Sequence, residues 1–291
     1  MGDGIAGGAR LAGGGVIVTG GGTGIGRACA ARLAADGATV TICGRTESAL
    51  VDAVPRISMA AGHGGSVQYV AADVTDERDV QRVVARALDM PGRLYGCVAN
   101  AGGGGVPAPL HAQDLDAFVQ VLHTNLVGAF LCLKHVLPHL VTGGGGSCVA
   151  ISSIASQITH RYFGAYPVAK AGVDYLMRNA ADEYGPAGVR CNAVYPGFIA
   201  TEIMDFIDRD GPIFASYVDN IPLGHVGEPE DVAALVRFLI GPESRFITGQ
   251  VIGIDGGQSL RRGPDFSSLV EAALGGKAAV TGSAPPSGQG G

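Results

Sequence analysis

A tyrosine and a lysine stand four residues apart in the pattern Tyr-x-x-x-Lys, at Tyr166 and Lys170. Residues with this spacing lie on one face of a helix, so the two side chains can interact. The lysine ammonium favours the phenolate and lowers the pKa of the phenol from its ordinary value of about 10, which makes the phenol a usable proton donor and acceptor near neutral pH. Pro167 would break a helix interior, so we expect the helix to begin at Ala165 or Tyr166.

Two more polar side chains precede this pair and could serve the same chemistry. Ser153 follows the apolar run 148–151, and a hydroxyl at the carboxyl end of a strand can hydrogen-bond a substrate carbonyl oxygen as that oxygen gains charge. Asn125 lies in a long helical stretch, where it could bend the helix and hold a water near Lys170, or be only a helix-surface amide. Together these residues predict proton transfer at a carbonyl or alcohol oxygen.

A glycine-rich turn at residues 19–26 joins the first apolar run to an Ala-rich helical pattern, with Gly20, Gly24 and Gly26 in the spacing GxxxGxG. In this context backbone N–H groups and a helix N-terminus can face a pyrophosphate. A tight turn that binds nothing is the simpler alternative in a chain with 48 glycines. The position of the turn in the first strand-helix unit favours dinucleotide binding.

The second expected strand ends in Gly44 and Arg45. An enzyme that selects NAD usually has an acid at this point to bind the ribose 2′-hydroxyl, whereas a 2′-phosphate requires a cation and no carboxylate. The pair therefore predicts that NADP(H) is preferred over NAD(H). The alternative is that Arg45 is an ordinary solvated charge.

The elements that must position these residues follow an alternation of short Val/Ile/Ala-rich runs and longer helical stretches, which is typical of βαβ units. We expect strands at 15–19, 38–43, 67–71, 95–99, 146–151, 189–194 and 250–254. We expect helices near 25–36, 46–61, 76–89, 113–141, 165–184 and 229–240. This order predicts an α/β fold, a single doubly wound Rossmann domain with a seven-stranded parallel sheet and helices on both faces.

Three segments do not follow the alternation of strands and helices: the two ends of the chain and residues 200–226. Residues 1–14 are expected to form a flexible N-terminal segment, residues 15–260 the Rossmann domain, and residues 200–226 within it a substrate lid. Residues 261–291 end in a Gly/Pro/Ser-rich run and are expected to be a flexible tail, apart from one or two helical turns at 267–274.

The composition argues against several classes of function. The net charge of −6 offers no basic field for nucleic acid. The six cysteines are scattered without a CxxC, which favours buried thiols in a reducing compartment. We expect no metal site, because Pro138 stands between His135 and His139 and no third ligand is near. We also expect no signal peptide and no window apolar enough to span a bilayer, and hence a cytoplasmic location without membrane partners.

The order and spacing of these motifs resemble those of the short-chain dehydrogenase/reductase family over residues 14–257. The matching positions are Gly20, Gly24, Gly26, Asn100, Ala101, Gly102, Asn125, Ser153, Tyr166, Lys170, Pro196 and Gly197. Ala99 stands where the family usually has the first of two asparagines, and the tail has no assignable counterpart.

The resemblance implies a role for each matched residue. Tyr166 would be the general acid and base, Lys170 would also bind the nicotinamide ribose, Ser153 would position the carbonyl, and Asn125 would maintain a proton relay. Cofactor contacts are expected from Gly20, Thr23, Gly24, Ile25, Gly26, Arg45, Asp73, Val74, Asn100, Ala101, Gly102, Tyr166, Lys170, Pro196, Gly197, Ile199 and Thr201. Of these, Asp73 would contact the adenine. The resemblance also implies a homotetramer or homodimer formed through helices 113–141 and 165–184.

We therefore expect an NADP(H)-dependent oxidoreductase that interconverts a carbonyl and a secondary alcohol on a small apolar or acyl-type substrate. Two alternatives remain, an enoyl- or dienoyl-CoA-type C=C reductase of the same superfamily and a non-catalytic dinucleotide sensor. The substrate pocket is expected to be lined by residues 154–163 and 200–226. The apolar side chains of these segments indicate a largely apolar ligand: Ile154, Ile158, Tyr162, Phe163, Ile203, Met204, Phe206 and Phe214.

Overall fold

The computed structural model describes residues 11–204, 207–261 and 266–276. Its sheet has seven parallel strands in the order β3-β2-β1-β4-β5-β6-β7. The strands are β1 (Gly14–Thr19), β2 (Thr39–Gly44), β3 (Ser66–Ala71), β4 (Arg93–Ala99), β5 (Gly146–Ile151), β6 (Val189–Pro196) and β7 (Val251–Ile254). Each overlaps an expected strand, so the Rossmann fold class is confirmed.

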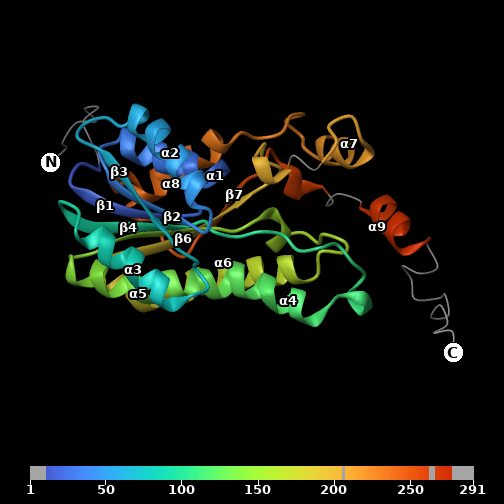
Figure 1. Cartoon of the computed structure of the whole chain (residues 1–291), viewed down its shortest axis with the longest axis horizontal. Coiled ribbons are helices and arrows are strands. Elements are labelled where there is room, and N and C mark those ends of the chain that lie inside the picture. Colours follow the sequence, from blue (N-terminus) through green and yellow to red (C-terminus); the bar gives the residue numbers. More distant parts are fainter. Residues whose placement is uncertain (1–10, 205–206, 262–265, 277–291) are drawn as a thin grey trace.

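Helices cover both faces of the sheet (Figure 1). They are α1 (Gly24–Ala35), α2 (Glu47–Ala60), α3 (Glu77–Leu88), α4 (Leu115–Leu122), α5 (Gly128–Thr142), α6 (Ala165–Tyr184), α7 (Pro212–Val218), α8 (Pro229–Ile240) and α9 (Ser267–Leu274). Helices α1, α2 and α8 pack on one face, and α3, α5 and α6 pack on the other. Strands that are covered by helices on both faces of the sheet need apolar side chains on both faces. Every residue of β1 and β5 is accordingly buried.

The order of the strands creates the crevice that the site requires. From β1 the chain continues outward to β2 and β3 on one side, and β4 to β7 extend on the other side. Ligands of open α/β sheets bind at such a reversal, at the carboxyl ends of the strands. The expected site residues therefore fall at one edge of the sheet.

The long helix expected at 113–141 is in fact two α-helices joined by a π-helical turn, His123–Val127, which contains Asn125. π-Helical turns are rare in proteins overall, and those that occur are often found at functional sites. The run Leu115–Thr142 is also long and apolar enough to cross a membrane, with a hydropathy of 1.4, which corrects our expectation that no window would be. Only 28% of that apolar window is buried: Leu133 and Leu137 pack in the core between this helical layer and the sheet, whereas side chains such as Leu115 and Phe130 stay exposed.

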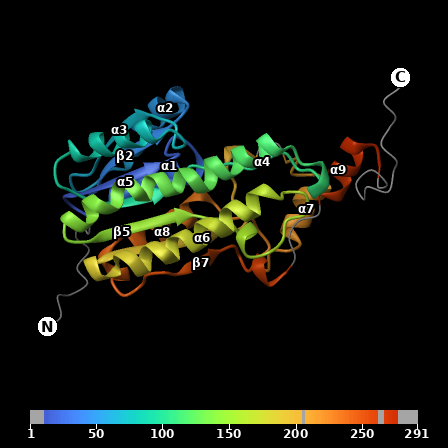
Figure 2. The same ribbon diagram turned by 90° about the horizontal axis from the view of Figure 1, so that it is seen from below.

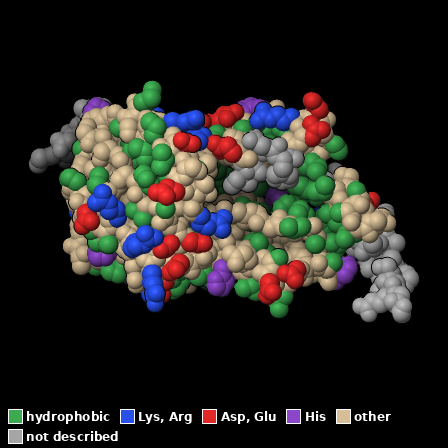
Figure 3. All heavy atoms as spheres, viewed as in Figure 1, with side chains coloured by type: hydrophobic (Ala, Val, Ile, Leu, Met, Phe, Trp, Pro, Cys, Tyr) green, Lys and Arg blue, Asp and Glu red, His purple; other side chains and the backbone are tan. Residues whose placement is uncertain are grey.

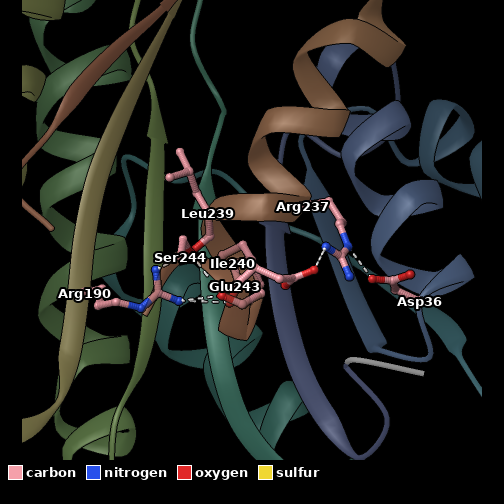
Figure 4. A network of polar contacts seen from close by, with 8 residues as sticks. Asp36, Arg190, Arg237, Leu239, Ile240, Glu243 and Ser244 are labelled. Atoms are coloured by element: carbon pink, nitrogen blue, oxygen red, sulfur yellow. Dashed lines mark hydrogen bonds and ion pairs between the residues drawn. The ribbon is translucent and has the colours of Figure 1, made fainter. Parts of the chain in front are cut away.

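Two arginines fix the end of α8 to the sheet (Figure 4). The Arg190 guanidinium on β6 donates to the carbonyl oxygens of Leu239 (2.7 Å), Ile240 (3.2 Å) and Gly241 (3.0 Å), and to Ser244 Oγ (2.7 Å). The last carbonyls of a helix have no partner within the helix, so a cation at this point both satisfies them and complements the helix dipole. Arg237 bridges the carboxylates of Asp36 and Glu243.

The segment expected to be a substrate lid, residues 200–226, contains the short turn Glu202–Met204 and α7, and an isolated bridge between Ile199 and Gly227 joins its two ends. Within the expected flexible tail, the helical turns expected at 267–274 are present as α9, which lies beside α7 (Figures 1 and 2). Phe266, directly before α9, is buried, so residues 266–276 are packed against the fold. The rest of the tail beyond 276, residues 262–265 and most of the N-terminal segment lie outside the described residues.

His135 contacts the Glu77 carboxylate at 2.8 Å, and Lys134 donates to the same oxygen at 2.6 Å. Among the residues that the structure describes, no group of three or more His, Cys, Asp or Glu side chains could hold a metal ion.

Candidate active site

The carboxyl ends of β1, β4, β5 and β6 open into a cavity of about 690 Å³. It brings together most of the residues expected from the sequence: Gly20, Thr23, Gly24, Ile25, Gly26, Asn100, Ala101, Gly102, Ser153, Tyr166, Lys170, Pro196, Gly197, Ile199 and Thr201. The glycine-rich turn lies at one end and the Tyr-x-x-x-Lys pair at the other. Figure 3 shows the hollowed surface, with hydrophobic side chains gathered toward the end of the molecule that carries α7 and α9.

Tyr166 lies in the first turn of α6, which begins at Ala165 as expected from Pro167. Burial raises the pKa of the Tyr166 phenol, and a hydrogen bond with Ser153 opposes that rise. We expected Lys170 to lower the pKa of Tyr166, and this expectation is wrong for the protein without a bound cofactor. The reason is geometric, because Lys170 Nζ lies 5.7 Å from the centroid of the tyrosine ring and donates instead to the carbonyl oxygen of Ile151, at 2.8 Å.

Lys170 is buried beneath the cavity. Desolvation lowers the pKa of its ammonium to about 8, and Asp174, one turn further along α6, opposes this effect. Asp174 is itself buried and accepts a hydrogen bond from Gln157 Nε2 at 2.7 Å, and burial raises the pKa of its carboxyl. The charged form of Lys170 is therefore destabilised by burial, so its protonation is sensitive to groups that enter the cavity.

Asn125 is buried and is not a helix-surface amide. Its Nδ2 donates to the carbonyl oxygens of Val121 (2.9 Å) and Gly103 (2.8 Å), and its Oδ1 accepts from Gly103 N (3.2 Å). A Cβ on Gly102 would lie 2.6 Å from Asn125 Oδ1 and 3.3 Å from Lys170 Nζ. Asn125 does not line the cavity itself, but it holds the loop after β4 against the lysine.

The glycine-rich turn is fastened to β4 by two polar side chains. Thr19 Oγ1 accepts from the backbone N–H groups of Asn100 (3.0 Å) and Ala101 (2.9 Å), and Asn100 Nδ2 donates to Thr19 O (2.8 Å). A Cβ on Gly26 would collide with Gly20 O and Asn100 Nδ2. This close approach of α1 to the turn requires a glycine at position 26 and presents the first helical N–H groups to the cavity.

A carboxylate from the short turn Glu202–Met204 occupies this helix N-terminus. Glu202 Oε2 accepts from Gly24 N at 3.0 Å, and Glu202 Oε1 pairs with Arg27 at 2.9 Å. The Glu202 oxygens stand where phosphate oxygens of a dinucleotide would be expected, because the unsatisfied N–H groups and the dipole of a helix both favour an anion there. The residues present therefore fit a diphosphate, which Gly24, Ile25 and Arg27 would hold.

Three expected cofactor residues lie outside the cavity: Arg45, Asp73 and Val74. Arg45 is exposed beyond β2. Asp73 Oδ1 accepts from Thr75 N (2.9 Å) and Thr75 Oγ1 (2.8 Å), as in a turn. Val74 is buried in the core.

The pocket list from the sequence is only partly confirmed. Ile154, Phe163 and Met204 line the cavity, whereas Ile158, Tyr162 and Phe214 do not. Phe206 and the side chain of Ile203 lie outside the described residues.

Three cavity-lining residues fall within the segments expected to line the pocket but were not singled out: His160, Glu202 and Tyr217. Sequence reasoning missed Phe198, Phe266 and Leu269, which also line the cavity and lie outside those segments. Phe198 stacks on Tyr217 with ring centroids 4.4 Å apart. His160 Nδ1 lies 3.1 Å from Ile158 O, and burial lowers the pKa of the imidazole. For Phe198 the available signal was its position directly after Pro196-Gly197, the motif at the end of β6.

Comparisons with known proteins place this arrangement in a family. Residues 20–259 match the family described as Enoyl-(Acyl carrier protein) reductase. The chain is 39% identical over 241 residues to cis-4-hydroxycyclohexanecarboxylate dehydrogenase of Sinomonas cyclohexanicum, a match that covers 83% of this chain and 94% of that protein. It is 35% identical to 7alpha-hydroxysteroid dehydrogenase of Clostridium sardiniense, over 86% of this chain and 95% of that protein.

A solved short-chain type dehydrogenase/reductase from Mycobacterium ulcerans superposes with a TM-score of 0.89 at 43% identity, covering 92% of this chain and 97% of that one. The family match, residues 20–259, includes the glycine-rich turn, the Tyr-x-x-x-Lys pair and the last strand. The relatives are oxidoreductases that act on small molecules, and the family uses a nicotinamide dinucleotide. The chain belongs to the short-chain dehydrogenase/reductase family.

Proposed function

We propose that the protein is an NADP(H)-dependent enzyme that interconverts a ring-borne secondary alcohol and the corresponding ketone, with Tyr166 as general acid and base. The observation that carries this proposal is that Tyr166, Ser153 and Lys170 meet at one end of the cavity whose other end is the glycine-rich turn. A bound dinucleotide supplies or accepts the hydride.

The chain's own side chains handle the proton and the developing charge. Tyr166 gives its phenolic proton to the substrate oxygen during reduction and takes it back during oxidation. The Ser153 hydroxyl donates a hydrogen bond to the same oxygen as it gains charge. Lys170 supplies a positive charge beneath them, and Asn125 holds the loop that separates the lysine from solvent.

The walls of the cavity support a ring-shaped apolar substrate. Aromatic side chains from separate segments, Phe163, Phe198, Tyr217 and Phe266, surround the end next to Tyr166. Two relatives are named for ring-borne alcohols, a hydroxycyclohexanecarboxylate and a hydroxysteroid. His160 is the imidazole on this wall and offers a polar contact to a second substituent.

The test is turnover of purified protein with NADPH or NADP⁺ on matched ketones and alcohols: cyclohexanone carboxylates, steroid ketones, open-chain 3-oxoacyl thioesters and 2-enoyl thioesters. We expect the ring ketones to have the highest kcat/KM. Preference for the 3-oxoacyl thioester would overturn the ring assignment while leaving the carbonyl chemistry intact.

A second candidate is reduction of an activated C=C bond, because the matched family is described as an enoyl reductase. The enoyl thioester arm of the same screen decides it. Consumption of NADPH by the enoyl thioester and by none of the ketones would replace the first proposal.

The buried lysine predicts a pH dependence. Ketone reduction needs a protonated Tyr166, whose pKa is raised, and a charged Lys170, whose pKa is about 8. We therefore expect kcat/KM for reduction to be constant below pH 7 and to fall above pH 8 as the lysine loses its proton. The rate of alcohol oxidation should instead rise with pH, because Tyr166 must then accept a proton.

Profiles of kcat/KM from pH 6 to 10 measure the reduction and the oxidation. In Lys170→Met the fall in reduction near pH 8 should be absent. A wild-type reduction profile that is flat to pH 10 would contradict this role for the lysine.

We further propose a homotetramer or homodimer in a cytoplasmic, reducing location. Apolar side chains stay exposed on the helical layer seen in Figure 2: Leu115, Val119, Phe130 and Val141 on α4 and α5, and Val168 and Tyr175 on α6. Exposed apolar side chains on neighbouring helices of one layer are typical of an interface. All six thiols are free and buried, which supports a reducing compartment.

Phe130→Glu should dissociate the assembly, because Phe130 is 46% exposed in this face and a carboxylate there would be desolvated. Sedimentation equilibrium measures the mass. The control is Met59→Glu on α2, on the opposite layer, where the side chain is 88% exposed. Equal masses for wild type and Phe130→Glu would place the interface elsewhere.

A further inference from the structure

The segment after β7 returns to the catalytic edge of the sheet. Phe266 is 1% exposed and packs in a cluster with Phe198, Ile207, Tyr217 and Ile221. Its ring meets Phe163 edge to face, with centroids 5.0 Å apart, and Tyr217 at 6.3 Å. A ring buried among other rings fixes its neighbours, so this segment is part of the site's architecture.

Polar contacts tie the same segment to the loop between two catalytic residues. Arg161 Nη1 donates to Ser267 Oγ at 2.9 Å, and Tyr162 OH lies 3.5 Å from the same oxygen. Both residues belong to the loop that leaves Ser153 and enters α6 at Tyr166. Tyr162 has φ +73°, a left-handed conformation that costs a non-glycine residue about 1 kcal/mol or more and persists where its surroundings hold it.

Two residues of this segment face the cavity. Phe266 and Leu269 line it together with Tyr166, whereas Val270 is buried against the fold and Leu274 is exposed, and neither of these two lines the cavity. Phe266 directly precedes α9, and Leu269 lies in the first turn of that helix, so both side chains reach the cavity from the same end of α9. This end of the helix thus meets the substrate space, and the buried Val270 anchors it.

We propose that Phe266 and Leu269 are specificity-determining residues, which close the substrate end of the cavity and limit the size of the ring that can approach Tyr166. This inference rests on the proposed ketone and alcohol chemistry. A wall of this kind both excludes water from the reacting atoms and rejects substrates that are too large, and one missing methylene in such a pocket changes selectivity by about 10-fold or more.

The test compares cavity-facing substitutions with matched controls on the same helix. Leu269→Ala is the main variant, since this side chain is 44% exposed and its loss should not unfold the protein. Phe266→Ala is the stronger one. Val270→Ala removes a buried side chain that does not line the cavity, and Leu274→Ala removes one that is 40% exposed and distant from it.

Two readouts are taken on each variant. The first is the ratio of kcat/KM for a steroid ketone to that for cyclohexanone, which we expect to rise by about 10-fold or more in Leu269→Ala and Phe266→Ala and to stay unchanged in the two controls. The second is quenching by acrylamide of the fluorescence of bound reduced dinucleotide, which we expect to increase only in the cavity-facing variants. The second readout needs no substrate.

The outcomes are separable. If wild type turns over none of these ketones, the proposed function is wrong, and the quenching result still decides whether α9 walls the cavity. If Val270→Ala shifts either readout as much as Leu269→Ala does, α9 acts only through packing, and the proposal fails. It also fails if neither cavity-facing variant differs from wild type.

Discussion

Tyr166→Phe should bind dinucleotide as wild type does and lose about 10²–10⁴-fold in kcat, the usual contribution of a general acid. The substitution removes the transferable proton and the hydrogen bond with Ser153, and it leaves the ring and its packing in the first turn of α6. Single-turnover ketone reduction measures the loss, and fluorescence titration with NADPH measures binding.

The cavity provides a matched control in Tyr217, a second phenol that lines it. Burial and the nearby Tyr166 raise the pKa of the Tyr217 phenol, so this group is held neutral. Tyr217→Phe should therefore keep kcat within a few-fold of wild type. Retention of more than about a tenth of wild-type kcat by Tyr166→Phe would assign the proton to another group, and it would reopen the possibility of a dinucleotide sensor.

Gly44→Asp should reverse the choice of cofactor from NADPH to NADH. The carboxylate would repel the 2′-phosphate and give the 2′-hydroxyl of NADH an acceptor. The site can take the larger side chain, because a Cβ on Gly44 would meet only Leu50 Cδ2, at 3.7 Å. A charge-assisted hydrogen bond is worth about 1.5–3 kcal/mol, which is about one to two decades in kcat/KM.

Gly44→Ala is the control for volume, because it adds the same Cβ without charge and should leave the preference unchanged. Arg45→Ala should weaken NADPH use and leave NADH use nearly unchanged, since Arg45 is exposed and only NADPH carries the 2′-phosphate that a guanidinium binds. The measurement is kcat/KM for both cofactors on all four proteins. Equal or better use of NADH by wild type would refute the assignment.

The alternating pattern was enough to predict all seven strands, because buried parallel strands differ in length and composition from the helices between them. The start of α6 was predictable for a local reason, the position of Pro167. The π-turn around Asn125 was not predictable, because one turn with π-helical hydrogen bonds leaves no periodic signal in the sequence. Its consequence, a buried amide bonded to Gly103, depends on tertiary contact.

The cavity residues that sequence reasoning did not single out were overlooked for a common reason, which is that tertiary contacts bring them to the site. Phe266 and Tyr217 are far apart in the chain, and their packing against each other is decided by the folded lid and tail. Glu202 reads as a surface acid and meets Gly24 only because the chain after β6 turns back over α1. The sign of the Tyr166 shift depends on a distance to Lys170 that the four-residue spacing does not determine.

The six buried cysteines have a practical consequence for handling the protein. They are spread over α1, α5, β2, β4, β5 and β6, and burial raises the pKa of the Cys29 and Cys132 thiols to about 12. Only a thiolate that is accessible reacts with iodoacetamide, so each alkylation event requires the sheet to open first. The rate of alkylation therefore reports the opening of the fold, residue by residue on both faces of the sheet, and an alkylated sample that has lost activity has lost it through unfolding.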